Sequence, residues 1–305
     1  MSRPRILVTG ASGFIGSRLC QRLLDDGVEV HAVCLRYRER VPAAAEIHEL
    51  DLGDGAAVDR LVAAVRPEVV FHLASHVAGA RDAELLLPTF QANLASTVHL
   101  LGALALGDGC RLFVQAGSLE EPAAADATPS SPYAAAKWAA AGYLRMAREL
   151  YDLPFVRARM FMVYGPGQSD LRKLVPYTVL SLLAGEEPSF SSGERPVDWV
   201  FVDDVVEGLA RIGARPDLGG ATVDLGSGSL ATVREVVEIL FNLLAPESEP
   251  RFGAHDDRSA EQVRRAATRQ TERQLGWRPA TDLRAGLTST VDWYRKELES
   301  GRIRR

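Results

Sequence analysis

Hydrophobic residues in the first half of the chain form short apolar runs separated by longer stretches of helical periodicity. The runs lie at Ile6–Val8, Val28–Val33, Val69–Leu73, Leu112–Val114 and Phe155–Met160. Between them, apolar residues recur at helical spacing over 14–26, 56–65, 83–106 and 132–151. Short apolar runs that alternate with amphipathic helices are typical of βαβ units. The pattern therefore predicts an α/β protein with a parallel, doubly wound sheet.

A glycine-rich segment joins the first apolar run to the first helical stretch. It reads Thr9-Gly10-Ala11-Ser12-Gly13-Phe14-Ile15-Gly16. In such a turn Gly10 permits the tight bend, Gly13 lets the backbone approach a pyrophosphate, and Gly16 lets the helix pack closely on the strand. The helix N-terminus supplies free N–H groups and the positive end of its dipole for the phosphates. The segment predicts a dinucleotide site in a Rossmann-type fold.

The regular alternation ends after Tyr164-Gly165-Pro166-Gly167, where turn-rich pieces separate shorter helical segments. We expect residues 1–165 to form the dinucleotide-binding domain. Residues 166–305 then form a smaller, loop-rich α/β lobe that binds the substrate, with 197–226 returning to the main sheet.

Composition limits the partners of the protein. The 305 residues carry a net charge of −5, which argues against nucleic acid as the main partner. The three cysteines are widely spaced and no metal-ligand spacing links the six histidines, so neither a disulfide framework nor a metal site is predicted. No secretory signal and no apolar stretch of membrane-spanning length is visible, so we expect a cytoplasmic protein without membrane contact.

Reactive side chains follow the apolar run at Leu112–Val114. Tyr133 and Lys137 have the i, i+4 spacing that places a phenol and an ammonium on one helix face. A phenol titrates near pH 10, and an adjacent cation favours its phenolate form. Ser118 lies near the carboxyl end of a predicted strand, where its hydroxyl can bind a substrate oxygen. Glu120 is two residues further on and offers a second acid or base.

Together these motifs resemble the extended short-chain dehydrogenase/reductase family, in its nucleotide-sugar epimerase/dehydratase branch. The matching segments run in the family's order over nearly the whole chain: Thr9 to Gly16, Asp51-Leu52, His72-Leu73-Ala74, Asn93, Gln115-Ala116-Gly117-Ser118-Leu119-Glu120, Tyr133 with Lys137, Tyr164-Gly165-Pro166-Gly167, Val202-Asp203-Asp204-Val205, and Leu275-Gly276-Trp277-Arg278-Pro279.

The resemblance implies a role for each matching residue. Tyr133 becomes the catalytic acid/base, Lys137 its ribose-binding partner and Ser118 the group that polarises the substrate oxygen. Glu120 matches a position that is acidic in sugar 4,6-dehydratases. The expected cofactor-binding residues are Gly10, Ser12, Gly13, Phe14, Ile15, Gly16, Arg36, Asp51, Leu52, Leu73, Ala74, Ser75, Asn93, Tyr133, Lys137 and Met160. The helical stretches 83–106 and 132–151 resemble the pair that forms the family's homodimer interface.

The end of the second strand departs from the NAD-binding pattern. Cys34 stands near where NAD-preferring members carry an acidic residue for the ribose hydroxyls, and Arg36 follows closely. An arginine there suits a 2′-phosphate through charge-assisted hydrogen bonds. The sequence therefore favours NADP(H), with NAD(H) as the alternative.

Other departures concern the substrate, which the resemblance indicates to be a nucleotide sugar. Met162 replaces a common asparagine, Val197 replaces an arginine that often contacts the diphosphate, and Pro122-Ala123 replaces a Tyr-Gly pair. Other basic residues can take over the diphosphate contact: Arg172, Lys173, Arg195, Arg264 or Arg265. The residues expected to bind substrate are His76, Ser118, Met162, Arg195 and Arg265, whereas His72 is expected to pack in the core.

Three functions are compatible with these residues. The favoured one is NADPH-dependent reduction of an NDP-4-keto-6-deoxyhexose, with Tyr133 as the acid, because a reductase consumes reductant at each turnover. The alternative is a nucleotide-sugar 4-epimerase or 4,6-dehydratase that recycles bound NAD internally, a reading that Glu120 supports. The third is a regulatory protein that only binds the cofactor.

Overall fold

The chain divides into two units, each with its own sheet. The computed structural model describes residues 3–124, 126–257 and 262–303. Unit 1 comprises the chain up to Met160 together with Val206–Asp224 and Gln270–Trp277. Unit 2 comprises Phe161–Val205, Leu225–Arg269 and the chain from Arg278 onward.

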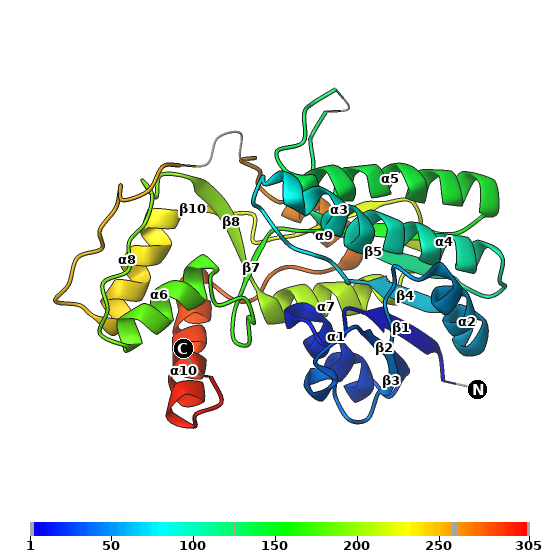
Figure 1. The fold of residues 1–305 in the computed structure, drawn as a ribbon, viewed down its shortest axis with the longest axis horizontal. Coiled ribbons are helices and arrows are strands. Elements are labelled where there is room, and N and C mark those ends of the chain that lie inside the picture. The colour runs from blue at the N-terminus through cyan, green and yellow to red at the C-terminus, as the bar shows by residue number, and fades with distance from the viewer. Residues whose placement is uncertain (1–2, 125, 258–261, 304–305) are drawn as a thin grey trace. The chain divides into compact units, whose positions relative to one another are not determined.

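Unit 1 is built on a seven-stranded sheet of order β3-β2-β1-β4-β5-β6-β9 (Figure 1). Its strands are β1 (Arg5–Thr9), β2 (Glu29–Cys34), β3 (Glu46–Glu49), β4 (Val69–His72), β5 (Leu112–Ser118), β6 (Phe155–Met160) and β9 (Thr222–Leu225). The pairs from β3 through β6 are parallel. The order reverses beside β1, so the carboxyl ends of β1 and β4 flank the switch point at which such sheets bind ligands.

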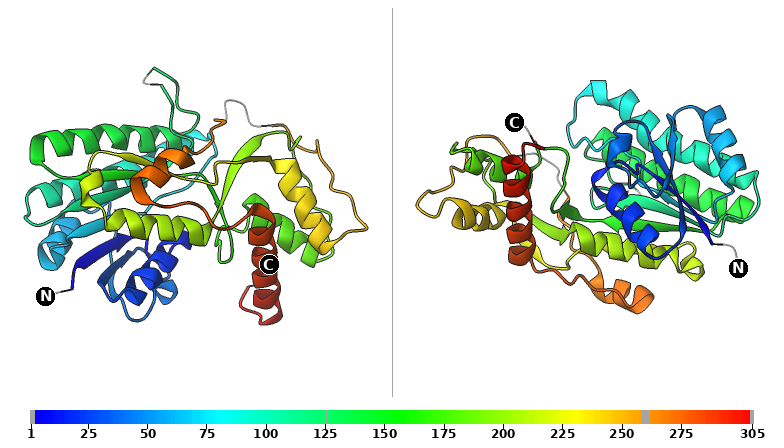
Figure 2. Two further views of the ribbon diagram at one scale, coloured as in Figure 1. Left: turned by 180° about the vertical axis from the view of Figure 1, so that it is seen from behind. Right: turned by 90° about the horizontal axis from the view of Figure 1, so that it is seen from below.

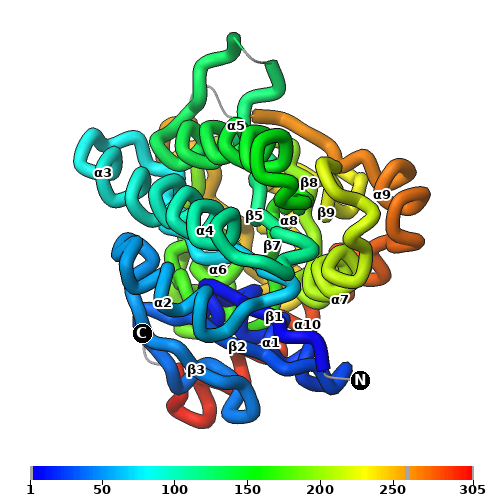
Figure 3. Tube along the Cα trace, turned by 90° about the vertical axis from the view of Figure 1, so that its right-hand side faces the viewer, coloured from blue at the N-terminus to red at the C-terminus, as the bar shows by residue number. Residues whose placement is uncertain are grey.

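Helices cover both faces of this sheet (Figures 2 and 3). One face carries α2 (Gly55–Val65), α4 (Ser96–Ala105) and α5 (Pro132–Tyr151), which pack against the strands through a core that includes Val58, Leu100 and Leu144. The other face carries α1 (Phe14–Asp25) and α7 (Val202–Gly213), which are joined by an ion pair between Arg22 and Glu207 at 3.2 Å. The expected doubly wound Rossmann-type fold is confirmed.

The predicted helix over 83–106 is interrupted. It consists of a 3-10 turn (Ala83–Leu85), α3 (Leu86–Thr89), a π-helical turn (Phe90–Ala95) and α4. A π turn inside a longer helix is rare and is often found at functional sites. This one contains Asn93, whose side chain is fully buried.

Unit 2 contains a three-stranded sheet of order β10-β8-β7. Its elements are β7 (Met162–Tyr164), α6 (Leu174–Leu183), β8 (Pro196–Phe201), β10 (Leu230–Thr232), α8 (Val233–Leu244) and α10 (Leu283–Glu299). The helices bury Val179, Leu240 and Val291 against the Trp199 and Phe201 side of β8. Thr232 and Glu235 form a capping box that starts α8 directly after β10.

The limits of the units differ from the expected limits at 165 and 197–226. Residues 161–165 lie in unit 2 because β7 pairs with β8. The returning segment is Val206–Asp224, which ends in β9 beside β6. A second return, Gln270–Trp277, is unexpected from the sequence and contains most of α9 (Thr268–Leu275). The Thr271 hydroxyl donates to the Asp224 backbone oxygen at 2.8 Å. The cofactor and substrate roles of the two units remain predictions.

Within the described ranges, none of the helices combines the length and apolar character needed to cross a lipid bilayer.

Candidate active site

The glycine-rich segment makes a turn that only glycine tolerates. Gly10 has φ +68°, and a Cβ atom on it would lie 2.7 Å from the backbone nitrogen of Ala74, two residues after the end of β4. A Cβ on Gly16 would collide with the backbone oxygen of Gly10, so α1 starts in close contact with the turn. Gly13 is the N-cap of α1, and its backbone N–H donates to the Gly10 oxygen at 2.9 Å. The backbone of the first helical turn is therefore brought to the carboxyl end of β1.

The start of α1 is open to an anion. No side chain of the described residues caps it by a hydrogen bond, and no acidic residue lies in its first turn. The Ser12 hydroxyl instead donates to the backbone oxygen of Arg36 at 2.8 Å. This bond ties the glycine turn to the exposed connection after β2, on which Arg36 lies.

Asn93 holds the loop after β4. Its Oδ1 accepts hydrogen bonds from the Ser75 hydroxyl at 3.0 Å and the His76 backbone N–H at 2.7 Å, and its Nδ2 donates to the His76 oxygen at 3.1 Å. His72 lies below this loop as a packing residue, as expected, with ring nitrogens 2.8 Å from the Thr9 hydroxyl and 3.1 Å from the Thr97 hydroxyl. Burial, together with Lys137, lowers the pKa of His72 to about 3, so the ring stays neutral at physiological pH.

The start of α5 places Tyr133 and Lys137 on its buried face. Ser131 caps the helix by accepting from the Ala134 N–H at 3.1 Å, and Pro132 occupies the first helical position, where its missing N–H has no cost. Tyr133 follows in the first turn and Lys137 one turn later, with Nζ 5.9 Å from the centre of the Tyr133 ring. Both residues are more than 90% buried.

Ser118 is the last residue of β5 and meets Tyr133. The Ser118 hydroxyl acts to lower the pKa of Tyr133. Burial acts more strongly, and with the charges of Glu120 and Glu121 it raises that pKa above its ordinary value. Lys137 is not among the causes, so its expected effect on the phenol is not seen in the protein alone. The phenol is therefore protonated at neutral pH, which is the form that can donate a proton.

Lys137 has a buried ammonium group. Among the described residues, no hydrogen-bond acceptor contacts its Nζ. Burial lowers its pKa to about 8, and the charge of Glu121 opposes this shift. A buried donor without an acceptor is costly, which indicates that a ligand oxygen completes this site.

Glu121 is a site residue that the sequence did not single out. It is 1% exposed, accepts from the Ser118 backbone N–H at 2.7 Å, and forms an ion pair with Arg157 of β6 at 2.7 Å. Its neighbour Glu120, which was the predicted acid/base, is partly buried, and its backbone N–H donates to the Ser118 hydroxyl at 3.2 Å. Glu121 thus fixes the end of β5, while Glu120 lies next to the Ser118 hydroxyl.

The comparisons with known proteins identify the family of the chain. Residues 6–226 match the NAD dependent epimerase/dehydratase family. The chain belongs to this family. It is therefore an enzyme of the short-chain dehydrogenase/reductase type that uses a nicotinamide cofactor, as the resemblance implied.

Relatives in the epimerase/dehydratase family match over nearly their whole length. A UDP-glucose 4-epimerase of Mycolicibacterium smegmatis is 34% identical, with 97% of this chain and 100% of the relative covered. A dTDP-glucose 4,6-dehydratase of Xanthomonas campestris pv. campestris is 30% identical, with 94% and 92% covered. The solved UDP-glucose 4-epimerase of Thermotoga maritima with UDP-glucose has a TM-score of 0.86 at 27% identity, with 96% of this chain and 99% of that chain covered.

These relatives shift the choice among the expected functions. They are epimerases and dehydratases, so they support the internally recycled reaction better than the reduction that the sequence analysis favoured. A reductase was expected because of the inferred NADPH site, whereas a solved Thermus thermophilus UDP-glucose 4-epimerase is a complex with NAD (29% identity, TM-score 0.82, covering 95% of this chain and 99% of that chain).

The residues of unit 1 fit the family's dinucleotide. Three features point to it: the glycine turn that a Cβ would fill, the open start of α1, and the Lys137 Nζ without an acceptor among the described residues. Other predicted contacts also lie on unit 1, with Leu52 buried, Asp51 accepting from the Gly53 N–H at 2.8 Å, and Met160 paired with Ser118 across β5 and β6. Their contacts with the cofactor remain predictions, as do those of Phe14, Ile15, Leu73 and Ala74.

Three of the predicted substrate residues lie on unit 2 instead. Met162 starts β7, Arg195 precedes β8 and donates to the Gln262 oxygen at 3.3 Å, and Arg265 is exposed. Asp198 was not predicted from the sequence. It is a buried residue of β8 that accepts from the backbone N–H groups of Ala266 and Gly228 at 2.9 and 3.0 Å. Asp198 therefore fixes the segment that carries Arg265.

Proposed function

We propose that the protein is a nucleotide-sugar 4-epimerase that oxidises and re-reduces its substrate at one carbon. The observation that carries the proposal is the buried group formed by Ser118, Tyr133 and Lys137, with the Lys137 Nζ lacking an acceptor among the described residues. Epimerisation needs one group that takes up and returns a proton, and in this proposal that group is Tyr133. The relative with 34% identity over almost the whole chain supports the same reaction.

The side chains have separate tasks in this proposal. Bound nicotinamide supplies reversible hydride transfer at the substrate carbon that carries the reacting hydroxyl. Tyr133 removes the proton of that hydroxyl and later returns it to the oxygen of the epimer. Ser118 donates a hydrogen bond to the same oxygen and stabilises the charge that develops on it. Lys137 binds a ribose oxygen and adds positive charge near the phenol.

Tyr133 cannot act as a base in the state described above, because its pKa is raised. Two changes on binding favour the phenolate. A ribose acceptor next to the Lys137 Nζ favours the charged ammonium, and the oxidised nicotinamide ring is itself positive. Cofactor binding is thus expected to prepare the base.

A 4,6-dehydratase is the second candidate, and Glu120 is the observation in its favour. Loss of water from the sugar requires an acid or base in addition to Tyr133. Glu120 lies beside Ser118 and close enough to Tyr133 to raise its pKa. Glu121 is unsuited to that task because it is engaged with Arg157 and the Ser118 backbone.

Product analysis distinguishes these reactions. The purified protein is incubated with UDP-glucose or dTDP-glucose, with no added reductant, and the products are followed by NMR and mass spectrometry. An epimerase yields a C4 epimer of unchanged mass, and a dehydratase yields a product lighter by one water. Turnover only of a 4-keto sugar with added NADPH contradicts the proposal and restores the reductase.

NADP(H) is the proposed preference, on the strength of Arg36. Its backbone is bonded to Ser12 in the glycine turn, and no carboxylate occupies position 34 or 36. A guanidinium near the end of β2 suits a 2′-phosphate. Mass spectrometry of the small molecules released on denaturation identifies any dinucleotide that the protein retains.

A homodimer is proposed through α3, the π turn and α5, which pack against one another in unit 1. These elements expose apolar side chains that include Leu87 at 62% and Leu150 at 64%. Clustered exposed apolar residues mark interfaces. In size-exclusion chromatography with light scattering, Leu87→Asp combined with Leu150→Asp is expected to give a monomer. Leu230→Asp, an exposed apolar position in unit 2, is the control and leaves a dimer; a wild-type monomer at all concentrations contradicts the proposal.

A further inference from the structure

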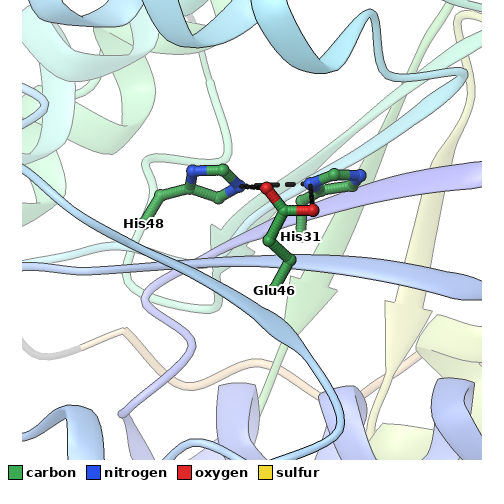
Figure 4. A group of neighbouring side chains, drawn as sticks. All are labelled: His31, Glu46 and His48. Atoms are coloured by element: carbon green, nitrogen blue, oxygen red, sulfur yellow. Dashed lines mark hydrogen bonds and ion pairs between the residues drawn. The ribbon is translucent and has the colours of Figure 1, made fainter.

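A polar cluster lies on the outer two strands of the unit 1 sheet. Strands β2 and β3 are parallel, with His31 opposite Glu46 and Val33 opposite His48. Side chains two residues apart share a face of a strand, and directly paired residues point to the same side. The pairing therefore brings His31, Glu46 and His48 together, although 17 residues separate the two histidines (Figure 4).

The two imidazole nitrogens lie close together, and each oxygen of the Glu46 carboxylate faces one of them at a separation near that of neighbouring ligands on a tetrahedral metal. His31 Nδ1 lies 3.1 Å from His48 Nε2 and 3.5 Å from Glu46 Oε2, and His48 Nε2 lies 3.7 Å from Glu46 Oε1. Zinc bonds of about 2.0–2.2 Å in a tetrahedron place neighbouring ligand atoms roughly 3.3–3.6 Å apart. The two nitrogens must separate slightly, and Glu46 must turn one oxygen toward both rings, for the three side chains to bind such an ion.

Glu29 independently prepares His31 as a ligand. His31 Nε2 lies 3.0 Å from Glu29 Oε1, on the side of the ring opposite the cluster. A proton held on Nε2 by the carboxylate leaves the Nδ1 lone pair facing His48 and Glu46. A carboxylate behind the ring is the usual outer partner of a metal-bound histidine.

The two imidazoles also have the environment that metal binding needs. The His31 side chain is 6% exposed and that of His48 is 21% exposed, and their rings stack with centres 5.4 Å apart. Glu46 is 65% exposed, so an ion can enter from solvent and keep a water molecule as its fourth ligand.

We propose that His31, His48 and Glu46 form a structural zinc site that fastens the edge strand β3 to β2. Two strands, β1 and β4, separate β2 from the strand that ends at Ser118, so the metal takes no part in the proposed catalysis. The proposal is independent of the enzyme's reaction. Zinc at this place restrains both ends of the β2–β3 connection, residues 35–45, on which Arg36 lies.

Calorimetric titration of the chelator-treated full chain with zinc tests the site. One zinc is expected per chain, with a concentration-dependent rise in Tm. His31→Gln and His48→Gln are expected to abolish saturable binding, and Glu29→Gln to weaken it by about 10- to 100-fold. His255→Gln, which changes a histidine of unit 2, is the matched control and binds as the wild type does. Magnesium and calcium, which prefer oxygen ligands, are not expected to compete.

Cobalt(II) gives a second measurement that needs no variant, since a tetrahedral site produces an intense visible absorption band that zinc abolishes. Circular dichroism in chelator shows whether each variant is folded. The surface substitutions Glu29→Gln and Glu46→Gln keep the test decisive where a histidine variant fails to fold. Absence of saturable zinc binding by the wild type, or equal affinity in folded His31→Gln and His48→Gln, overturns the proposal.

Discussion

Two polar clusters on one sheet are assembled in different ways. The Ser118, Tyr133 and Lys137 group joins a strand end to the first two turns of α5, so two of its three members follow from helix spacing. The His31, Glu46 and His48 cluster exists only because β2 and β3 pair in one particular register. Short-range geometry can be recognised as a sequence motif, whereas strand register cannot.

The clusters also differ in exposure, and this makes their expected responses to substitution different. The Ser118, Tyr133 and Lys137 group is buried, and the charged side chains around it need partners of opposite charge. The second opens to solvent through Glu46, which is 65% exposed. Substitutions in the first cluster should therefore affect activity and folding strongly, and those in the second should be mild in the absence of metal.

The largest effect is expected from Tyr133→Phe, which removes the proton-transfer group and leaves the ring in place. Turnover should fall by about 100- to 10,000-fold, since this is the range of general acid–base catalysis. Steady-state kinetics measure it, and retention of the cofactor shows that the site remains folded. Tyr143→Phe, on the exposed side of α5, is the control. Near-normal turnover by Tyr133→Phe would show that Tyr133 is not the proton-transfer group.

Glu121→Ala tests the buried charge network. The substitution leaves the partly buried Arg157 guanidinium without its carboxylate, and loss of one partner of a buried ion pair typically costs about 3–5 kcal/mol of folding free energy. Glu46→Ala, in chelator, should change the unfolding free energy by no more than about 0.5 kcal/mol because the side chain is exposed. Urea denaturation compares the two variants. Equal changes in the unfolding free energy of the two variants would mean that burial does not decide how strongly each cluster responds to substitution.

Lys137 gives a pH-dependent contrast. Its pKa is about 8 in the folded protein and 10.5 in its ordinary state, so the unfolded chain binds more protons between these values. The unfolding free energy therefore rises with pH across this window, by on the order of 3 kcal/mol from this residue. Lys137→Met should remove that rise, and Lys296→Met, an exposed position, should not. Denaturation curves at several pH values measure it; an unchanged slope contradicts the assignment.

The smallest effect is expected at the exposed Arg36. If Arg36 binds a 2′-phosphate, Arg36→Ala should weaken NADPH binding by about tenfold, which corresponds to roughly 1.4 kcal/mol. The affinity for NADH should be almost unchanged. Fluorescence titration with both cofactors measures this ratio. Arg38→Ala, in the same connection, is the control. An unchanged preference would show that the NADP(H) proposal is wrong.

Much of unit 1 could be predicted because its signals are local. The limits of β6 and α5 match the expected segments, since an apolar run and a Ser-Pro helix start mark them. Strand β3 was missed because Glu46-Ile47-His48-Glu49 has a single apolar residue and is stabilised by pairing with β2. Without β3, the pairing of two distant histidines could not be seen.

Glu121 shows the same limit at the candidate active site. Two adjacent glutamates are equivalent in the sequence, and only the fold buries one of them against Arg157 and leaves the other beside the Ser118 hydroxyl. The second return to unit 1 was missed for a related reason. It is held by the Thr271 contact with Asp224 and by Arg211 and Arg215, which donate to the backbone oxygens of Gly276 and Gln274. These contacts join segments with no shared local pattern.

The π turn at Phe90–Ala95 has a consequence for how this part of the gene can vary in length. Each residue of a helix advances it by about 100° around its axis. Loss of one codon before Asn93 would let the segment relax toward a regular helix and swing the amide away from Ser75 and His76. Conservative replacements of the exposed side chains of this helix leave the position of Asn93 around the helix axis unchanged. Homologous chains that keep the hydrogen bonds of Asn93 to Ser75 and His76 should therefore vary here in side-chain identity and very little in the number of residues.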